Sequence, residues 1–259
     1  MHNLNHIENF LFDMDGTLYL GNQLFEGVSQ LFETLIKRDK KFLLLTNNSS
    51  KDKNLYQKKW KGFGIDMPLQ KILTSGEATF AYLKAETIVK SVFVLGTESL
   101  KKEALDSGFS LNDINPDAVV LGYDTSLAYE NLVKACLLLQ KNKLYFATHP
   151  DINCPSELGP LPDCGAMIEM IHASTGRRPK ILGKPNKEMV DAALQRINGK
   201  SSNTAIVGDR LYTDMEMGYR ANLTTILVLS GEATLDDLKT APRQPDFVMK
   251  NINGIIPLI

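Results

Sequence analysis

The chain has 259 residues, of which 43% are hydrophobic and 23% charged, and its formal net charge is -1. This length suits one α/β core with a second, smaller domain, and the hydrophobic content is enough to bury a sizeable core. The near-neutral charge excludes the electrostatic footprint of a protein that binds nucleic acid or an anionic membrane surface.

The cysteines and the N-terminal residues bear on location. The 3 cysteines are an odd set without the close pairs of a zinc site, which favours a reducing compartment. The first residues lack the basic start and apolar stretch of a signal peptide, and no run approaches the roughly 18 apolar residues of a membrane helix. We therefore expect a soluble, cytoplasmic protein with no membrane or nucleic-acid partner.

The first predicted strand, residues 9–13, ends in Asp13 and continues into Asp15 and Gly16. A strand turns residues i and i+2 to one face about 6–7 Å apart, so the two carboxylates can share a cation and a substrate while the glycine lets the chain turn. A calcium loop would need its glycine sixth and a glutamate twelfth, where this chain has Leu24. An ordinary turn stays open as an explanation, since Asp and Gly are common in turns. The pattern favours a site for magnesium and phosphate.

A second strand is predicted at 41–46, between helices near 30–38 and 55–63, and it ends in Thr46, Asn47 and Asn48. Hydroxyl, amide and free backbone N–H groups at the start of a helix favour an anion. A generic helix cap would use the same residue types, so this cluster indicates phosphate binding only together with the other motifs.

Residues 76–179 carry none of these motifs but continue the alternation of strands and helices. Strands are predicted at 91–96, 118–122 and 144–147, and helices at 99–108 and 129–141. This alternation predicts a second α/β unit.

Two more motifs follow. Lys184 precedes a proline that suits the first turn of a helix, and the strand 204–209 ends in Gly208 and Asp209, with Asp214 where the next helix begins. Further strands are predicted at 225–229 and 247–249. Alternating strands and helices predict parallel sheets, in which loops at the carboxyl ends of the strands meet and bind ligands.

The four motifs, in this order, resemble those of the haloacid dehalogenase superfamily of phosphohydrolases, and their wording is similar to the NagD-like, 4-nitrophenyl phosphatase branch of class IIA. The resemblance implies a doubly wound, Rossmann-like α/β core formed by residues 1–78 and 179–259. It also implies an inserted, smaller α/β cap domain of the C2 type at residues 79–178.

The chemistry of the motif residues gives each a candidate role. Asp13 is the candidate nucleophile, which forms an aspartyl-phosphate, and Asp15 is the candidate general acid and base. Magnesium prefers oxygen ligands and is expected at Asp13, the backbone carbonyl of Asp15, Asp209 and, in an outer position, Asp214. The candidate phosphate-binding residues are Thr46, Asn47, Asn48 and Lys184.

The proline-rich segment from 147 to 165 resembles the substrate loop of this branch, which implies that His149, Asp151 and Asn153 contact the substrate. The branch usually has Thr-Asn-x-Asp and later Pro-Gly-x-Gly here. This chain has His149 in place of the asparagine and Asp163 in place of the first glycine. These departures leave the substrate preference open.

The sequence therefore predicts a magnesium-dependent phosphatase of small phosphate monoesters, such as a sugar phosphate or a nucleoside monophosphate, that also accepts nitrophenyl phosphate. A phosphomutase of the same superfamily and a non-catalytic phosphate-binding regulator are the alternatives. The expected partner is a small phosphorylated metabolite, and a homo-oligomer stays open.

Overall fold

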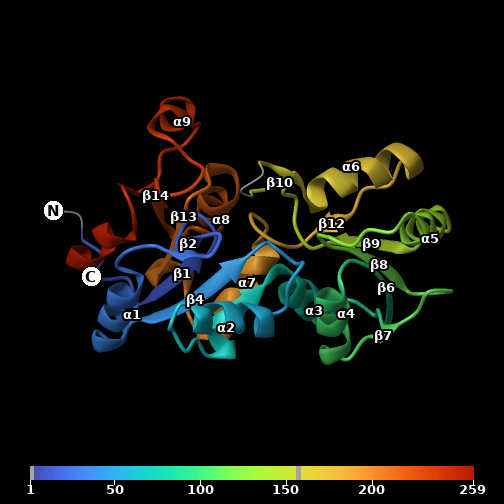
Figure 1. Cartoon of the computed structure of the whole chain (residues 1–259), viewed down its shortest axis with the longest axis horizontal. Helices are drawn as coiled ribbons and strands as arrows, with labels where there is room; N and C mark the ends of the chain where they lie inside the picture. The colour runs from blue at the N-terminus through green and yellow to red at the C-terminus, as the bar shows by residue number, and fades with distance from the viewer. Residues whose placement is uncertain (1–2, 156–158) are drawn as a thin grey trace. The chain divides into compact units, whose positions relative to one another are not determined.

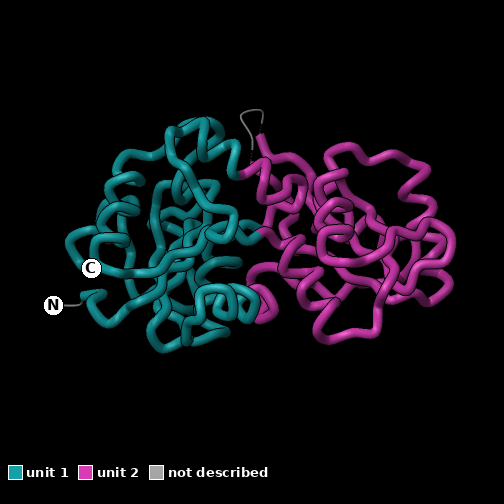
Figure 2. Tube along the Cα trace, turned by 90° about the horizontal axis from the view of Figure 1, so that it is seen from below, with its two compact units in different colours: residues 1–46, 57–73, 190–259 teal, residues 47–56, 74–189 magenta. Residues whose placement is uncertain are grey.

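The computed structural model describes residues 3–155 and 159–259. The chain divides into two compact units, which Figure 2 colours separately. Unit 1 contains residues 1–46, 57–73 and 190–259, and unit 2 contains residues 47–56 and 74–189. The predicted core and cap boundaries stay predictions, and residues 1–2 and 156–158 within them lie outside the described residues.

Unit 1 is built on a sheet with the strand order β15-β14-β13-β1-β4-β5 (Figure 1). Strand β1 pairs in parallel with β4 and β13, and β13, β14 and β15 continue in parallel. All residues of β1 are buried, as expected of a parallel strand covered on both faces. The strands are β1 (Asn9–Asp13), β4 (Lys41–Thr46), β5 (Ile72–Thr74), β13 (Thr204–Gly208), β14 (Thr224–Val228) and β15 (Phe247–Met249).

The chain order across this sheet reverses at β1. It proceeds from β1 to β4 and β5 on one side, and from β13 to β14 and β15 on the other. In open α/β sheets, the loops at such a reversal point diverge and leave room for a ligand at the carboxyl ends of the strands. The predicted doubly wound α/β fold is confirmed, and at the reversal Asp13 ends β1 while Asp209 directly follows β13.

Aromatic side chains bring two helices onto this core. Phe32 stacks on Phe42 of β4, with ring centroids 4.6 Å apart, and also packs against Trp60 at 5.8 Å. The helices with residues in this unit are α1 (Val28–Lys37), α2 (Lys53–Gly62), α7 (Lys187–Ile197), α8 (Glu216–Ala221) and α9 (Leu235–Thr240), and a hairpin joins β2 (Tyr19–Leu20) to β3 (Gln23–Leu24).

Unit 2 contains a second parallel sheet with the strand order β12-β9-β8-β6-β7. Its strands are β6 (Ser91–Leu95), β7 (Ser110–Leu111), β8 (Ala118–Leu121), β9 (Leu144–Ala147) and β12 (Lys180–Ile181). Its helices are α3 (Ser75–Glu86), α4 (Glu98–Asp106), α5 (Tyr129–Gln140) and α6 (Cys164–Thr175), and a short antiparallel ladder joins β10 (Asn153–Cys154) to β11 (Leu161–Pro162).

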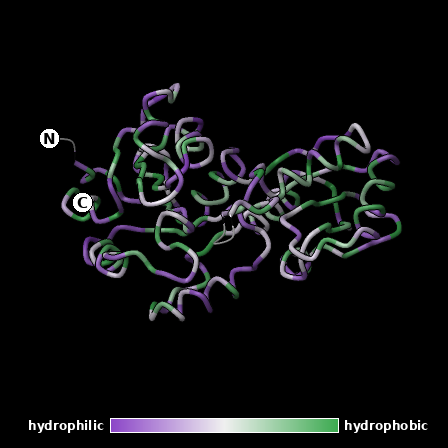
Figure 3. Tube along the Cα trace, turned by 45° about the horizontal axis from the view of Figure 1, so that its top comes forward, coloured by the Kyte–Doolittle hydropathy of each residue, from purple (hydrophilic) through white to green (hydrophobic). Residues whose placement is uncertain are grey.

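Alternating residues of this second sheet enter two separate clusters. Phe93 and Val119 pack with α5 and α6, whereas Val92 and Val120 pack with α3 and α4. Figure 1 shows α5 and α6 on one face of the sheet and α3 and α4 on the other. Figure 3 shows that hydrophobic and hydrophilic stretches alternate along the whole trace. Successive strand residues point to opposite faces, so both faces are covered.

Four features differ from the sequence predictions. Helix α3 and the β2–β3 hairpin were not predicted, and the proline-rich segment contains the β10–β11 ladder. Helix α7 begins at Lys187, so Pro185 precedes the helix instead of occupying its first turn.

Among the described helices, none is both long and apolar enough to span a membrane.

Candidate active site

Three buried carboxylates meet where β1 and β13 end. Asp13, Asp209 and Asp214 each offer one oxygen, and these oxygens lie within 4.8 Å of one another. The Thr17 hydroxyl lies 3.3 Å from Asp13 Oδ2 and 3.2 Å from Asp209 Oδ1. Asp13 ends β1, whereas Asp209 and Asp214 both lie in the segment that follows β13, and the parallel sheet brings these two strand ends to one edge.

Backbone donors and close glycines hold this cluster in place. Glu232 N–H donates to Asp209 Oδ2 at 2.8 Å, and Arg210 N–H donates to Asp214 Oδ2 at 3.2 Å. A Cβ added at Gly16 would collide with Asp209, and one at Gly231 would do the same. Gly16 also has φ +86, in the left-handed region that favours glycine.

The electrostatics of the cluster fit a cation. Burial, together with the nearby charges of Asp13 and Asp214, raises the pKa of Asp209 to about 8. Like charges this close disfavour each other's ionised form, and a divalent ion with oxygen ligands would relieve the repulsion. The donor set, made only of carboxylates, suits a hard cation such as magnesium.

Asp15 is arranged differently from the three clustered carboxylates. Its side chain is 41% exposed; its Oδ2 accepts from the Tyr19 hydroxyl at 3.2 Å, and its Oδ1 lies 3.8 Å from Lys59 Nζ. Lys59 also lies over the Tyr19 ring, 3.7 Å from the centroid. A carboxyl group at the surface, held by a phenol and an ammonium, can exchange protons with water. Thr46 is buried at the end of β4, beside the end of β1.

In unit 2, the Asn47 side chain joins three segments. Its Oδ1 accepts from Lys184 N–H at 2.9 Å, and its Nδ2 donates to Lys184 O at 3.0 Å. The same Nδ2 lies 3.3 and 3.2 Å from the two oxygens of Asp151. A Cβ at Gly183 would collide with Thr148 O, so the glycine allows this close approach.

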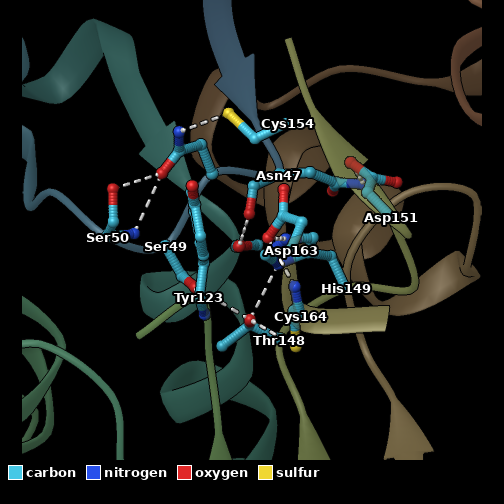
Figure 4. Close-up of polar contacts among 12 residues, drawn as sticks. Asn47, Ser49, Ser50, Tyr123, Thr148, His149, Asp151, Cys154, Asp163 and Cys164 are labelled. Atoms are coloured by element: carbon cyan, nitrogen blue, oxygen red, sulfur yellow. Dashed lines mark hydrogen bonds and ion pairs between the residues drawn. The ribbon is translucent and has the colours of Figure 1, made fainter. Parts of the chain in front are cut away.

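His149, predicted to contact the substrate, is fully buried. Its Nδ1 lies 2.8 Å from Thr148 Oγ1, and its Nε2 lies 2.9 Å from Asp163 Oδ1 (Figure 4). Oxygen or nitrogen atoms of His149, Asp151 and Asp163 also lie within 4.8 Å of one another. Since protein groups already engage the ring and carboxylate atoms, this group forms a hydrogen-bond network. A direct contact of His149 with substrate stays a prediction that these bonds do not favour.

The two other predicted binding residues of this unit, Asn48 and Asn153, are not among the three residues His149, Asp151 and Asp163. Asn48 Nδ2 contacts Cys154 Sγ at 3.8 Å, and its Oδ1 accepts from Ser50 N–H at 3.0 Å. Asn153 is exposed in the short strand β10.

Four residues without a predicted role contribute to these arrangements: Thr17, Lys59, Ser49 and Thr148. Thr17 belongs to the first motif and could have been assigned from its position there. The other three are ordinary polar residues, and no spacing in the sequence distinguishes them.

Comparison with known proteins gives matches to two hydrolase family models and to several phosphatases. The model of the haloacid dehalogenase-like hydrolase family matches residues 10–110, and a related HAD-hydrolase-like model matches residues 181–255. The chain is 33% identical over 254 residues to an acid sugar phosphatase of Staphylococcus haemolyticus, covering 98% of this chain and 97% of that one. It is also 33% identical over 244 residues to a dihydroxyacetone phosphatase of Corynebacterium glutamicum, covering 94% and 89%.

Solved structures show the same similarity. A 4-nitrophenylphosphatase from Thermotoga maritima aligns with a TM-score of 0.95 and 46% identity, covering 99% of each chain. NagD from E. coli K-12 aligns with a TM-score of 0.88 and 32% identity, covering 95% of this chain and 96% of that one.

Proposed function

This chain belongs to the haloacid dehalogenase-like hydrolases, and from that premise we propose that it is a magnesium-dependent phosphatase of small phosphate monoesters. Phosphoric monoester hydrolysis is its reaction class. The observation that carries the finer proposal is the buried group of Asp13, Asp209 and Asp214 at the reversal point of the sheet. Three carboxylates in one buried place are costly unless a cation shares them.

In the proposed first step, a carboxylate oxygen of Asp13 attacks phosphorus in line with the ester bond. The phosphorus–oxygen bond to the leaving group breaks, and Asp15 gives its proton to the departing oxygen. The product is an aspartyl-phosphate on Asp13 and a free alcohol. The contacts of Asp15 with Tyr19 and Lys59 support this role, since they hold its partly exposed carboxyl group in one place.

In the second step, Asp15 takes a proton from water as the water oxygen attacks phosphorus. The bond between phosphorus and the Asp13 oxygen breaks, which releases inorganic phosphate and restores the carboxylate. Magnesium held by Asp13, Asp209, Asp214 and the Asp15 carbonyl would offset the negative charge of the carboxylates and the phosphate. The sequence motifs assign the phosphate oxygens to Thr46, Asn47 and Lys184, and we retain that assignment.

For the leaving group, we propose a small hydroxylated compound such as a sugar or triose. The support is the printed activity of two relatives, an acid sugar phosphatase and a dihydroxyacetone phosphatase. Polar groups of unit 2, including Asp151 and Asn48, are of the kind that such a compound would require.

The test is a panel of dihydroxyacetone phosphate, a hexose 6-phosphate, a nucleoside 5′-monophosphate and 4-nitrophenyl phosphate, each with and without magnesium. We expect inorganic phosphate to accumulate in step with substrate loss, only with the metal. Turnover without added metal in the presence of a chelator would contradict the metal dependence. An isomeric phosphate ester without free phosphate would identify a mutase instead.

A further inference from the structure

We propose that His149 and Asp163 are paired positioning residues that set the selectivity of the enzyme by fixing its cap loop. The cap loop here means residues 148–155 and 159–163, the described parts of the segment between β9 and α6. This inference rests on the proposed phosphatase function and concerns how the leaving group is chosen.

The two residues form one bond of a longer chain of contacts, drawn in Figure 4. Tyr123 N–H donates to Ser49 Oγ at 2.9 Å, and Ser49 Oγ lies 3.0 Å from Thr148 Oγ1. Thr148 Oγ1 lies 2.8 Å from His149 Nδ1, and His149 Nε2 lies 2.9 Å from Asp163 Oδ1. All five residues are buried.

The donor is fixed only at the two ends of this chain. A backbone N–H at Tyr123 can only donate, and the Asp163 carboxylate accepts. Between Ser49 and Thr148 either hydroxyl can be the donor, and Thr148 Oγ1 also lies 3.9 Å from Cys164 Sγ. Because the Asp163 carboxylate accepts, the proton shared with it belongs to His149 Nε2.

Asp163 also fixes the far end of the cap loop. Its Oδ1 accepts from Cys164 N–H at 2.6 Å and caps helix α6, and its own N–H donates to Ile152 O at 2.9 Å. Gly165 N–H donates to Asp151 O at 2.7 Å. One carboxylate thus ties the start of the loop, through His149, to the start of the next helix.

The contacts of the cap loop extend to Asn47 and Asn48, which are proposed to bind the phosphate of the substrate. Three successive side chains, Asn47, Asn48 and Ser49, contact Asp151, Cys154 and Thr148 respectively. The cap loop is therefore attached along its length to the segment that follows Thr46. A loop fixed this closely presents its polar groups in one arrangement, which is what selection among leaving groups requires.

His149 and Asp163 are also the two positions at which this chain departs from the pattern of the branch it resembles. Replacing a glycine by aspartate at a buried site would leave an unpaired charge unless a donor faced it, and His149 is that donor. The two departures therefore belong together, because Asp163 supplies the acceptor and His149 the donor of one hydrogen bond.

The experiment uses four variants of the full chain: Asp163→Asn, Asp163→Ser, His149→Asn and the double variant His149→Asn with Asp163→Ser. Asparagine keeps an oxygen that can cap α6 and accept from His149. Serine still caps the helix but is too short to reach the ring as well. The readouts are the His149 tautomer by long-range proton–nitrogen NMR, the midpoint of thermal unfolding, and kcat and KM for 4-nitrophenyl phosphate and the fastest alkyl phosphate of the panel. The chain has 4 histidines, so the spectrum can be assigned by substitution.

We expect Asp163→Asn to retain the tautomer and the ratio of kcat/KM between the two substrates. Asp163→Ser and His149→Asn should each reduce that ratio about tenfold, mainly through KM for the alkyl phosphate. The double variant should lose no more than the worse single variant, because both changes break the same bond.

Independent losses that multiply in the double variant, or an unchanged kcat/KM ratio in both Asp163→Ser and His149→Asn, would overturn the proposal. If the wild type hydrolyses no ester, the proposed function fails instead. The tautomer and the coupling of the two residues in thermal unfolding then still decide whether they form a positioning pair.

Discussion

Asp13 is the residue on which the proposed reaction depends most directly. We expect Asp13→Asn to reduce turnover of 4-nitrophenyl phosphate by more than about 10³-fold, because an amide cannot attack phosphorus. The fold should persist, since asparagine has the same shape and Thr17 can still hydrogen-bond to it. Steady-state kinetics with circular dichroism as the folding control would check this. Near wild-type turnover in a folded variant would refute the nucleophile assignment.

Asp15 offers a finer test, because its contribution depends on the leaving group. Nitrophenolate leaves without a full proton, whereas an alkoxide needs one. We expect Asp15→Ala to slow alkyl phosphates by about 10²–10⁴-fold and 4-nitrophenyl phosphate much less. Paired kinetics on the two substrates measure the difference. Equal losses would show that Asp15 chiefly organises the surrounding groups, including Lys59.

Glu103, in helix α4 of unit 2, is expected to make the stability of the protein depend on pH. Burial raises the pKa of Glu103 from 4.5 to about 8, even though the Thr74 hydroxyl donates to its Oε1 at 2.6 Å. Between these two pH values the folded state keeps a proton that the unfolded state releases, so the free energy of unfolding should fall as pH rises from 4.5 to about 8.

The matched variant is Glu103→Gln, which has no charge to lose. Its free energy of unfolding should depend less on pH over the same window and exceed that of the wild type at the upper end. Urea unfolding at several pH values provides the measurement. Parallel curves for the two proteins would show that Glu103 ionises freely in the folded state.

At the scale of elements, the turn after β1 lies against the carboxylate cluster, so its backbone conformation affects the space around Asp209. Gly16 has φ +86 and Gly64 has φ +80, but only at Gly16 would a Cβ collide, there with Asp209. Alanine at either position should cost about 1–2 kcal/mol from the left-handed backbone. Only Gly16→Ala should also raise the magnesium concentration needed for half-maximal activity. Similar magnesium dependence in both variants would show that a Cβ at Gly16 does not disturb metal binding.

The strands show why much of the fold could be predicted. β1, β4, β9 and β15 begin and end at the predicted residues, because each is a short apolar run bounded by polar or turn residues. Helix α3 was missed because it follows β5 without a loop and is buried along several sides, so no polar face marks it. The strands of the β2–β3 hairpin have 2 residues each, too few to show a period.

The site was predictable where residues follow strand ends, as with Asp13 and Asp209. The role of Asn47 was not, because its partners Asp151 and Lys184 lie 104 and 137 residues away in the chain. Nothing in the spacing of the sequence indicates that an asparagine side chain clamps the backbone of a lysine. The His149–Asp163 bond likewise depends on how a long loop folds.

At the scale of the whole molecule, metal binding should be linked to stability. A ligand that binds only the folded state stabilises it in proportion to the logarithm of its concentration. We therefore expect magnesium to raise the midpoint of thermal unfolding of the wild type and a chelator to reverse the effect. Asp209→Asn should lack this response. A magnesium-dependent shift that persists in this variant would locate the cation elsewhere.

The division of the chain into units has a consequence for hybrid proteins. The boundary between unit 1 and unit 2 is crossed after residues 46, 56, 73 and 189. A chimera that exchanged only residues 74–189 with a relative would retain the native Asn47 and Ser49 opposite foreign versions of Asp151 and Thr148. The short segment 47–56 should therefore be exchanged together with residues 74–189, because the two segments form one unit although they are separate in the chain.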